Sequence, residues 1–117
     1  MMQLYRHTTF ECSKIITQKY STSFTLGIKT LEKKYHDPIY AIYGYVRYAD
    51  EIVDTFHSFD KRKLLSNYKK ETYKAIEEGI SLNPVLNAFQ EVVNEYHINH
   101  DLIEAFLYSM EMDLDTD

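Results

Sequence analysis

IYAIYGYVRYADEIVDTF, residues 39–56, reads as one helix that is apolar on most of its circumference. Close to its end, this helix nevertheless carries four charged residues: Arg47, Asp50, Glu51 and Asp54. At about 100° per residue, three of them share one narrow stripe with Tyr43, namely Arg47, Asp50 and Asp54. A helix that is apolar on several sides is normally central, and carboxylates are rarely buried without a cation. We therefore expect Asp50 and Asp54 to face an interior cavity that contains cations.

The apolar positions of this helix fall on two sides. A strip beside the charged stripe is formed by Ile39, Ile42, Val46, Ala49 and Val53. The back of the helix is formed by Ala41, Tyr45 and Ile52. Because both sides are apolar, we expect other helices to surround this one.

The size and composition of the chain favour one small domain. With 117 residues, the chain is long enough for one modest core, and its hydrophobic content of 44% excludes general disorder. The net charge of -5 argues against nucleic acid as a partner. The single cysteine, Cys12, excludes an internal disulfide, and the N-terminus has no signal-peptide pattern, so we expect a cytoplasmic protein. No apolar run approaches the ~20 residues of a membrane span, so any membrane contact would be peripheral.

The helix-capping residues and the apolar periodicity of the chain predict six helices and no strands. Glycine and proline are few, and no stretch alternates apolar and polar residues for long enough to form a strand. The expected boundaries are a start at Thr8 with a Thr8–Glu11 capping box, a short helix over 24–35, a start at Asp37–Pro38, a loop over 57–62, a start at Asn83–Pro84 and a last helix capped by Asn99. The residues expected to face inward include Leu65, Tyr68, Thr72, Ala75, Ile76, Ile80, Val85, Phe89, Val92, Tyr96, Leu102 and Ile103.

The last residues, 112–117, contain none of the usual signals that end a helix. Glycine is absent there, and acidic side chains are disfavoured at a helix C-terminus, where the helix dipole prefers cations. We therefore expect residues 1–117 to form a single all-helical domain that is the N-terminal portion of a longer protein.

Asp50 and Asp54 lie one helical turn apart, a spacing that suits a shared divalent ion. Magnesium takes oxygen ligands and commonly bridges a few carboxylates to phosphate oxygens. The alternative is a solvated charge cluster, in which Arg47 pairs with Asp50 and Glu51. The apolar surroundings of the stripe favour the metal site.

Arg47 and Tyr43 extend the stripe toward the start of the helix. Arg47 could neutralise the carboxylates or bind a diphosphate through bidentate hydrogen bonds, and the two roles are compatible. Tyr43 could contact a substrate, or it could be a core aromatic residue whose hydroxyl is hydrogen-bonded.

Two further segments carry polar groups that could join a site. YSTSF, residues 20–24, places the hydroxyls of Ser21 and Ser23 at a helix start, where backbone N–H groups favour phosphate; a structural N-cap is the alternative. SMEMDL, residues 109–114, places Asp113 at the end of an inward-facing helix, although acidic terminal segments are usually solvated.

YSTSF, the helix IYAIYGYVRYADEIVD and SMEMDL, in this order, resemble the squalene and phytoene synthase family of head-to-head prenyl transferases. The chain looks closest to the bacterial phytoene synthases of carotenoid biosynthesis. The resemblance implies an all-α isoprenoid-synthase fold with a central cavity. It implies these site residues: Asp50, Glu51 and Asp54 for Mg2+; Ser21, Ser23, Phe24 and Arg47 for the substrate diphosphate; Tyr43 beside the reacting carbons; and Asp113 as a possible later acid.

The resemblance also implies a reaction. Family members of the phytoene type condense two geranylgeranyl diphosphates into a cyclopropyl diphosphate, which is ionised again and rearranged to phytoene. A second aspartate-rich helix completes their metal site, and this chain ends before such a helix. We therefore expect residues 1–117 to be inactive alone and to self-associate through uncovered apolar faces.

Three other readings remain open from the sequence. A squalene synthase-type enzyme would also need a nicotinamide reductant, and no GxGxxG loop is present, although family members need not use one. A dimetal-carboxylate bundle is suggested by Asp54-x-x-His57, but no second such pair exists. A non-catalytic helical interaction module would bind a partner protein and would not respond to magnesium.

Overall fold

The computed structural model describes residues 1–115, which form an all-α chain with no strand among them. The elements are α1 (Met2–Tyr20), α2 (Thr22–Lys29), the 3-10 turn η1 (Lys33–Tyr35), α3 (His36–Asp54), α4 (Lys61–Glu78), α5 (Pro84–Tyr96) and α6 (His100–Asp115). The predicted all-α class is therefore confirmed, as is the count of six α-helices in this part of the chain. Thr116 and Asp117, which belong to the acidic end discussed above, lie outside the described residues.

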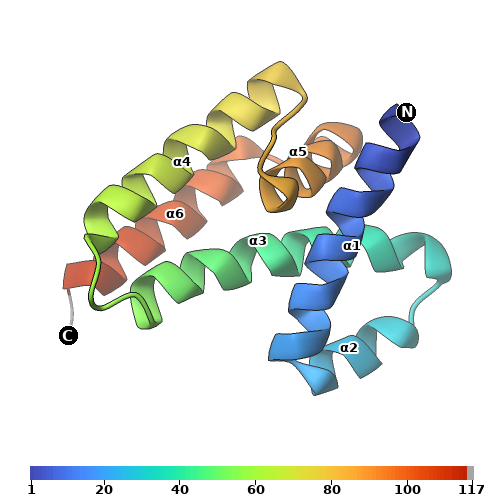
Figure 1. Cartoon of the computed structure of the whole chain (residues 1–117), viewed down its shortest axis with the longest axis horizontal. Helices are drawn as coiled ribbons and strands as arrows, with labels where there is room; N and C mark the ends of the chain where they lie inside the picture. Colours follow the sequence, from blue (N-terminus) through green and yellow to red (C-terminus); the bar gives the residue numbers. More distant parts are fainter. Residues whose placement is uncertain (116–117) are drawn as a thin grey trace.

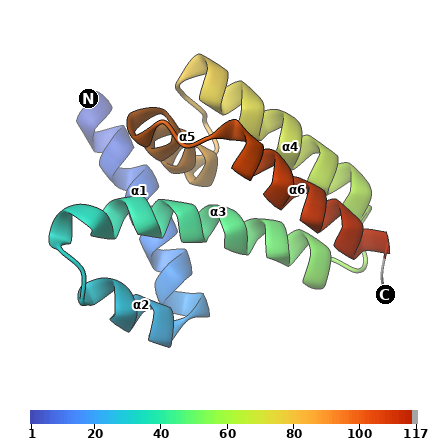
Figure 2. The same cartoon turned by 180° about the vertical axis from the view of Figure 1, so that it is seen from behind.

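Helix α3 runs through the middle of the molecule (Figure 1). Helix α1 crosses α3, α2 lies beside the first half of α3, and α4 and α6 lie side by side near its other end. Seen from behind, α6 approaches α3 toward the C-terminal ends of both helices (Figure 2). No described helix combines the length and the apolar character needed to cross a bilayer.

Two of the predicted helix starts are confirmed by their caps. The backbone N–H groups of Val85 and Leu86 donate to Asn83 Oδ1 at 3.0 and 3.2 Å, and Pro84 occupies the first turn. The backbone N–H of Asp101 donates to Asn99 Oδ1 at 2.8 Å. Both asparagines satisfy N–H groups that a helix start leaves without an intrahelical acceptor.

Three predicted boundaries are wrong. Helix α1 begins at Met2 rather than Thr8, because the Thr8 hydroxyl donates to the Leu4 carbonyl at 2.7 Å within a continuous helix instead of capping a new one. The helix predicted over 24–35 divides into α2 and η1. Helix α3 begins at His36, so that Asp37 and Pro38 lie inside its first turn.

The main core is centred on Tyr45 of α3. Its ring stacks on Phe89 of α5 with centroids 3.8 Å apart and on Tyr68 of α4 at 5.0 Å. Its hydroxyl lies 2.9 Å from Thr72 Oγ1, and the Tyr68 hydroxyl donates to the Tyr45 carbonyl at 2.8 Å. Most of the predicted inward residues are buried in this part of the chain: Leu65, Tyr68, Thr72, Ala75, Ile76, Val85, Phe89, Val92 and Ile103.

Three residues predicted to face inward are exposed instead: Ile80, Tyr96 and Leu102. Helix α4 ends at Glu78, and Gly79 adopts a left-handed conformation with φ of 71°, which turns Ile80 away from the helical line. Tyr96 is the last residue of α5, and Leu102 lies beside Ile103, which takes the buried position in that turn.

The close crossing of α1 and α3 depends on Gly44. A Cβ atom at this position would lie 2.9 Å from Ser13 Oγ and 3.0 Å from Ser13 Cβ. Ser13 is fully buried, and among the described residues its hydroxyl has no hydrogen-bond partner. The crossing brings the end of α1, and therefore the turn over residues 20–24, against the charged stripe of α3.

Candidate functional site

The charged stripe of α3 lies partly buried at one end of the helix. The side chains of Arg47, Asp50 and Glu51 are 24%, 32% and 13% exposed, whereas Asp54, the last residue of α3, is exposed. Within the described chain, the expectation that both aspartates face an interior cavity is therefore wrong for Asp54. Helix α3 ends at this position, and its side chain is not covered by the neighbouring helices.

The back of α3 is buried throughout, whereas the strip beside the stripe is buried only at Ala49 and Val53. Of the back, Ala41, Tyr45 and Ile52 are all buried. In the rest of the strip, Ile39 and Val46 are half-buried and Ile42 is exposed. Helices α1, α4 and α5 pack against the back, and they leave part of the predicted strip open. The stripe therefore borders the less covered side of the helix.

Arg47 is held by neighbours on two sides. Its Nη2 donates to Glu51 Oε1 at 2.7 Å, and its Nη1 lies 4.0 Å from Asp50 Oδ2. Its guanidinium lies over the ring of Tyr20, 4.9 Å from the ring centroid. The charge-cluster alternative predicted that Arg47 pairs with Asp50 and Glu51, and the pair with Glu51 is present. The three side chains are nevertheless partly buried, which is the property that favoured a functional site.

The hydroxyl-rich turn meets the stripe through an aromatic contact. The ring of Phe24 stacks on Tyr43 with centroids 4.8 Å apart. The backbone N–H of Phe24 donates to Ser21 Oγ at 3.0 Å, so Ser21 is the N-cap of α2, as its structural alternative predicted; Ser23 is exposed. Ser21, Ser23 and Phe24 border a mainly apolar groove of about 510 Å3 together with Gly27, Ile28, Leu31 and Ile39.

Asp113 of α6 reaches the electrostatic neighbourhood of Asp50. Partial burial raises the pKa of Asp50, and the carboxylates of Asp54, Asp113 and Glu51 raise it further, whereas Arg47 lowers it. Three segments that are distant in the sequence, the turn at 20–24, the end of α3 and the end of α6, therefore converge on one region.

The raised pKa of Asp50 predicts a stabilising substitution. A raised pKa means that the folded chain binds the Asp50 proton more tightly than the unfolded chain, so stability is lost as the pH rises above the ordinary carboxyl range. Asp50→Asn is therefore expected to raise the melting temperature at pH 7 by a few degrees, on the order of 1 kcal/mol or less. The gain is expected to shrink toward pH 4, where the wild-type carboxyl also becomes protonated.

A matched control for this prediction is Glu71→Gln, which removes one charge from an exposed position of α4. Thermal unfolding of the three proteins at both pH values tests the idea. A gain from Asp50→Asn that is as large at pH 4 as at pH 7 would contradict it.

The described residues contain no group of three or more His, Cys, Asp or Glu side chains arranged to hold a metal ion. The donors on α3 differ in how well they suit a cation. Asp50 lies in a field of other carboxylates, which favours a cation, whereas Glu51 is already paired with Arg47. The fit is therefore better for Asp50 than for Glu51.

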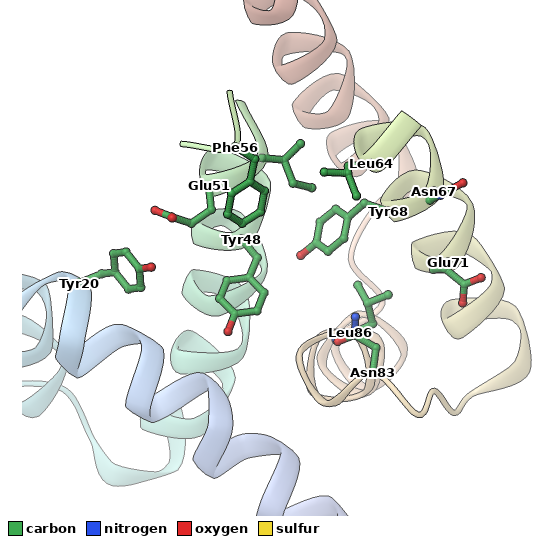
Figure 3. A pocket seen from close by; sticks show the side chains of 11 residues that line it. Tyr20, Tyr48, Glu51, Phe56, Leu64, Asn67, Tyr68, Glu71, Asn83 and Leu86 are labelled. Carbon is green, nitrogen blue, oxygen red and sulfur yellow. The ribbon is translucent and has the colours of Figure 1, made fainter. Parts of the chain in front are cut away.

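A separate cavity of about 530 Å3 lies between α3 and α4 (Figure 3). Its lining consists of Tyr20, Tyr48, Glu51, Ile52, Phe56, Leu64, Asn67, Tyr68, Glu71, Asn83 and Leu86. Among the described residues, Glu51 is the one predicted site residue in this lining. Glu51 and Tyr20 also contact Arg47, so the cavity adjoins the stripe at that residue.

Tyr20 is the contact residue that the sequence analysis did not single out. Its ring covers the Arg47 guanidinium, although it is half-exposed. Its position as the first residue of YSTSF, directly before the two serines, was the available signal.

Comparisons with known proteins identify the family. The squalene/phytoene synthase family model matches residues 17–117, which include the turn at 20–24, all of α3 and Asp113. A presqualene diphosphate synthase from Rhodopseudomonas palustris is 24% identical over 96 residues, which cover 82% of this chain and 34% of the relative. The chain thus spans about a third of the length of that curated relative. No solved structure matches the chain. The chain belongs to the squalene/phytoene synthase family.

Proposed function

We propose that residues 1–117 form part of the active site of a phytoene synthase-like prenyl transferase. The proposed reaction condenses two geranylgeranyl diphosphates head-to-head through a cyclopropyl diphosphate. The observation that supports it best is the approach of two distant segments to the stripe of α3: the turn at 20–24 contacts Tyr43 and Arg47, and the Asp113 carboxylate acts on the pKa of Asp50.

The residues divide into groups that bind charge and groups that face hydrocarbon. Arg47 would bind the diphosphate together with the polar groups at Ser21 and Ser23. Asp50 and Asp54 would hold magnesium, which withdraws negative charge from the departing diphosphate when bound. The stacked rings of Tyr43 and Phe24 would lie beside the prenyl chain, where aromatic faces stabilise carbocations and exclude water.

A ligand-dependent rise in melting temperature is the expected result for this site. Magnesium together with a non-reactive geranylgeranyl diphosphate analogue should stabilise the folded chain, by about 2.7 kcal/mol at a ligand concentration of one hundred times Kd. Geranylgeraniol, which lacks the diphosphate, and magnesium alone are the controls. The absence of any shift with the analogue and magnesium together would contradict the proposal.

We also propose that residues 1–117 bind the substrate without converting it, because the described carboxylates form no complete metal site. Incubation with geranylgeranyl diphosphate and magnesium should therefore yield no phytoene. Phytoene formation would refute the inactivity, although it would support the assignment of the reaction.

The name of the curated relative favours a second candidate, a squalene synthase-type enzyme that makes presqualene diphosphate. The two candidates differ in the length of the prenyl chain that they prefer. The thermal shifts given by farnesyl and geranylgeranyl diphosphate analogues would separate them, since the preferred chain should give the larger shift at equal concentration.

The non-catalytic readings have less support in the described residues. Helix α3 ends at Asp54 and His57 lies in the following turn, so the two do not share a helical face as the ligand pair of a dimetal bundle would; His57 Nδ1 lies 3.0 Å from Lys61 Nζ. Large apolar side chains are exposed near the groove, among them Leu26, Leu31 and Ile42. We propose that these faces drive self-association of residues 1–117, and a stable monomer in light scattering would count against it.

A further inference from the structure

We infer that Glu51 and Tyr20 are positioning residues that hold Arg47 in the conformation that receives a diphosphate, and that Glu51 is not a metal ligand. The diphosphate part of this inference rests on the proposed function. The arrangement of the three side chains does not, and it can be tested without any ligand.

The ion pair between Arg47 and Glu51 is the tighter of the two on this helix. Nη2 lies 2.7 Å from Glu51 Oε1, whereas Nη1 lies 4.0 Å from Asp50 Oδ2. Glu51 is the least exposed of the three side chains, at 13%. Partial burial reduces solvent screening, so this pair holds the guanidinium more firmly than a surface pair would.

Tyr20 closes the arrangement from the end of α1. Its ring lies under the guanidinium at 4.9 Å, and Figure 3 shows Tyr20 and Glu51 on the same side of α3. Partial burial and then the nearby Glu51 carboxylate raise the pKa of the Tyr20 hydroxyl, which agrees with their closeness. The guanidinium plane is therefore fixed by a carboxylate at one edge and a ring at one face.

Arg47 keeps donors for a further acceptor. Among the described residues, its Nε is buried without a hydrogen-bond partner, and its Nη1 forms no hydrogen bond, since Asp50 Oδ2 lies 4.0 Å away. A guanidinium carries five N–H donors, so an anion can bind at Nη1 while Nη2 stays paired with Glu51.

The same contacts argue against Glu51 as a metal ligand. A cation at Glu51 would have to approach a carboxylate that already has a guanidinium nitrogen 2.7 Å away. Asp50 lies instead in a field of carboxylates that includes Asp113 from α6. Two adjacent residues of α3 therefore have different roles. Asp50 is placed to bind a cation, whereas Glu51 orients Arg47, which binds an anion.

Binding of inorganic pyrophosphate without metal, measured by calorimetry, tests the role of Glu51. Glu51→Gln is expected to weaken binding about ten-fold, because a freed arginine side chain must be ordered again on binding. A carboxylate with no positioning role would merely repel the anion, so its removal would strengthen binding. Equal or tighter binding by Glu51→Gln, with Glu71→Gln as the matched charge control, would overturn the inference.

Two substitutions of Tyr20 test the ring. Tyr20→Phe keeps the aromatic face and is expected to bind pyrophosphate within about two-fold of wild type, whereas Tyr20→Leu should bind about three- to ten-fold more weakly. Equal affinities of the two variants for pyrophosphate would show that the Tyr20 ring does not position Arg47.

Nuclear magnetic resonance of the ligand-free protein separates this inference from the proposed function. The Arg47 Nε–H signal, assigned through its loss in Arg47→Lys, should exchange slowly with water in wild type and rapidly in Glu51→Gln and Tyr20→Leu. Unchanged exchange in both variants would overturn the inference. Failure of the wild-type chain to bind pyrophosphate, with the exchange behaving as expected, would count against the proposed function alone.

Discussion

Tyr45→Ala is expected to lower the free energy of unfolding by about 3–5 kcal/mol, the usual cost of removing a large aromatic side chain from a core. Tyr45 joins three helices, since it stacks on Phe89 with an interplanar angle of 4° and on Tyr68 with an angle of 18°. A domain of this size has a total stability of about 5–15 kcal/mol, so the variant should lose much of it.

Tyr45→Phe is the matched variant, because it keeps the ring and removes the hydroxyl. The Thr72 hydroxyl still donates to the Tyr68 carbonyl at 2.7 Å, so the loss should be about 1 kcal/mol. Urea unfolding followed by circular dichroism measures both changes. If the alanine variant lost no more stability than the phenylalanine variant, the stacked rings would not be the centre of the core.

Gly44→Ala is expected to destabilise the chain by about 1–3 kcal/mol, because the added Cβ would overpack the crossing of α1 and α3. The new atom would lie 2.9 Å from Ser13 Oγ and 3.3 Å from Ser13 Cα. Replacing glycine by alanine inside an uncrowded helix normally stabilises by about 0.5–1 kcal/mol, so a net loss would identify the contact as its cause.

A double-mutant cycle with Ser13→Gly tests this cause directly. The Ser13→Gly variant removes the two nearest atoms that a Cβ at position 44 would meet, Oγ and Cβ, so Gly44→Ala should be far less harmful in that background. A coupling free energy near zero would show that the crossing adjusts without cost, and that Gly44 does not set its closeness.

The elements that the sequence predicted well are those whose signals are local. Asn83–Pro84 contains both a cap acceptor and a proline suited to a first turn, and the inward residues of α4 and α5 follow the helical period. The start of α1 was predicted wrongly because the Thr8 hydroxyl can either cap a helix or bond to the carbonyl four residues earlier, and spacing does not decide between them.

The candidate site shows the same limit. The period of α3 places Tyr43, Arg47 and Asp50 on one stripe, and the structure brings the turn at 20–24 to that stripe. Spacing alone could not show that Glu51 pairs with Arg47, because an acid four residues after an arginine can pair with it or bind a metal equally well. Spacing also could not show which side of α3 the other helices would cover. The helical period shows which residues share a face, but it does not show which helix packs against that face.

The crossing at Gly44 and Ser13 contains no group that reacts, yet it sets the distance between Tyr20 and Arg47. Gly44 lies one turn before Arg47, and Ser13 lies two turns before Tyr20, so any widening at the crossing would carry the ring away from the guanidinium. Libraries that vary the groove around Gly27, Ile28 and Leu31 should therefore keep positions 13 and 44 fixed.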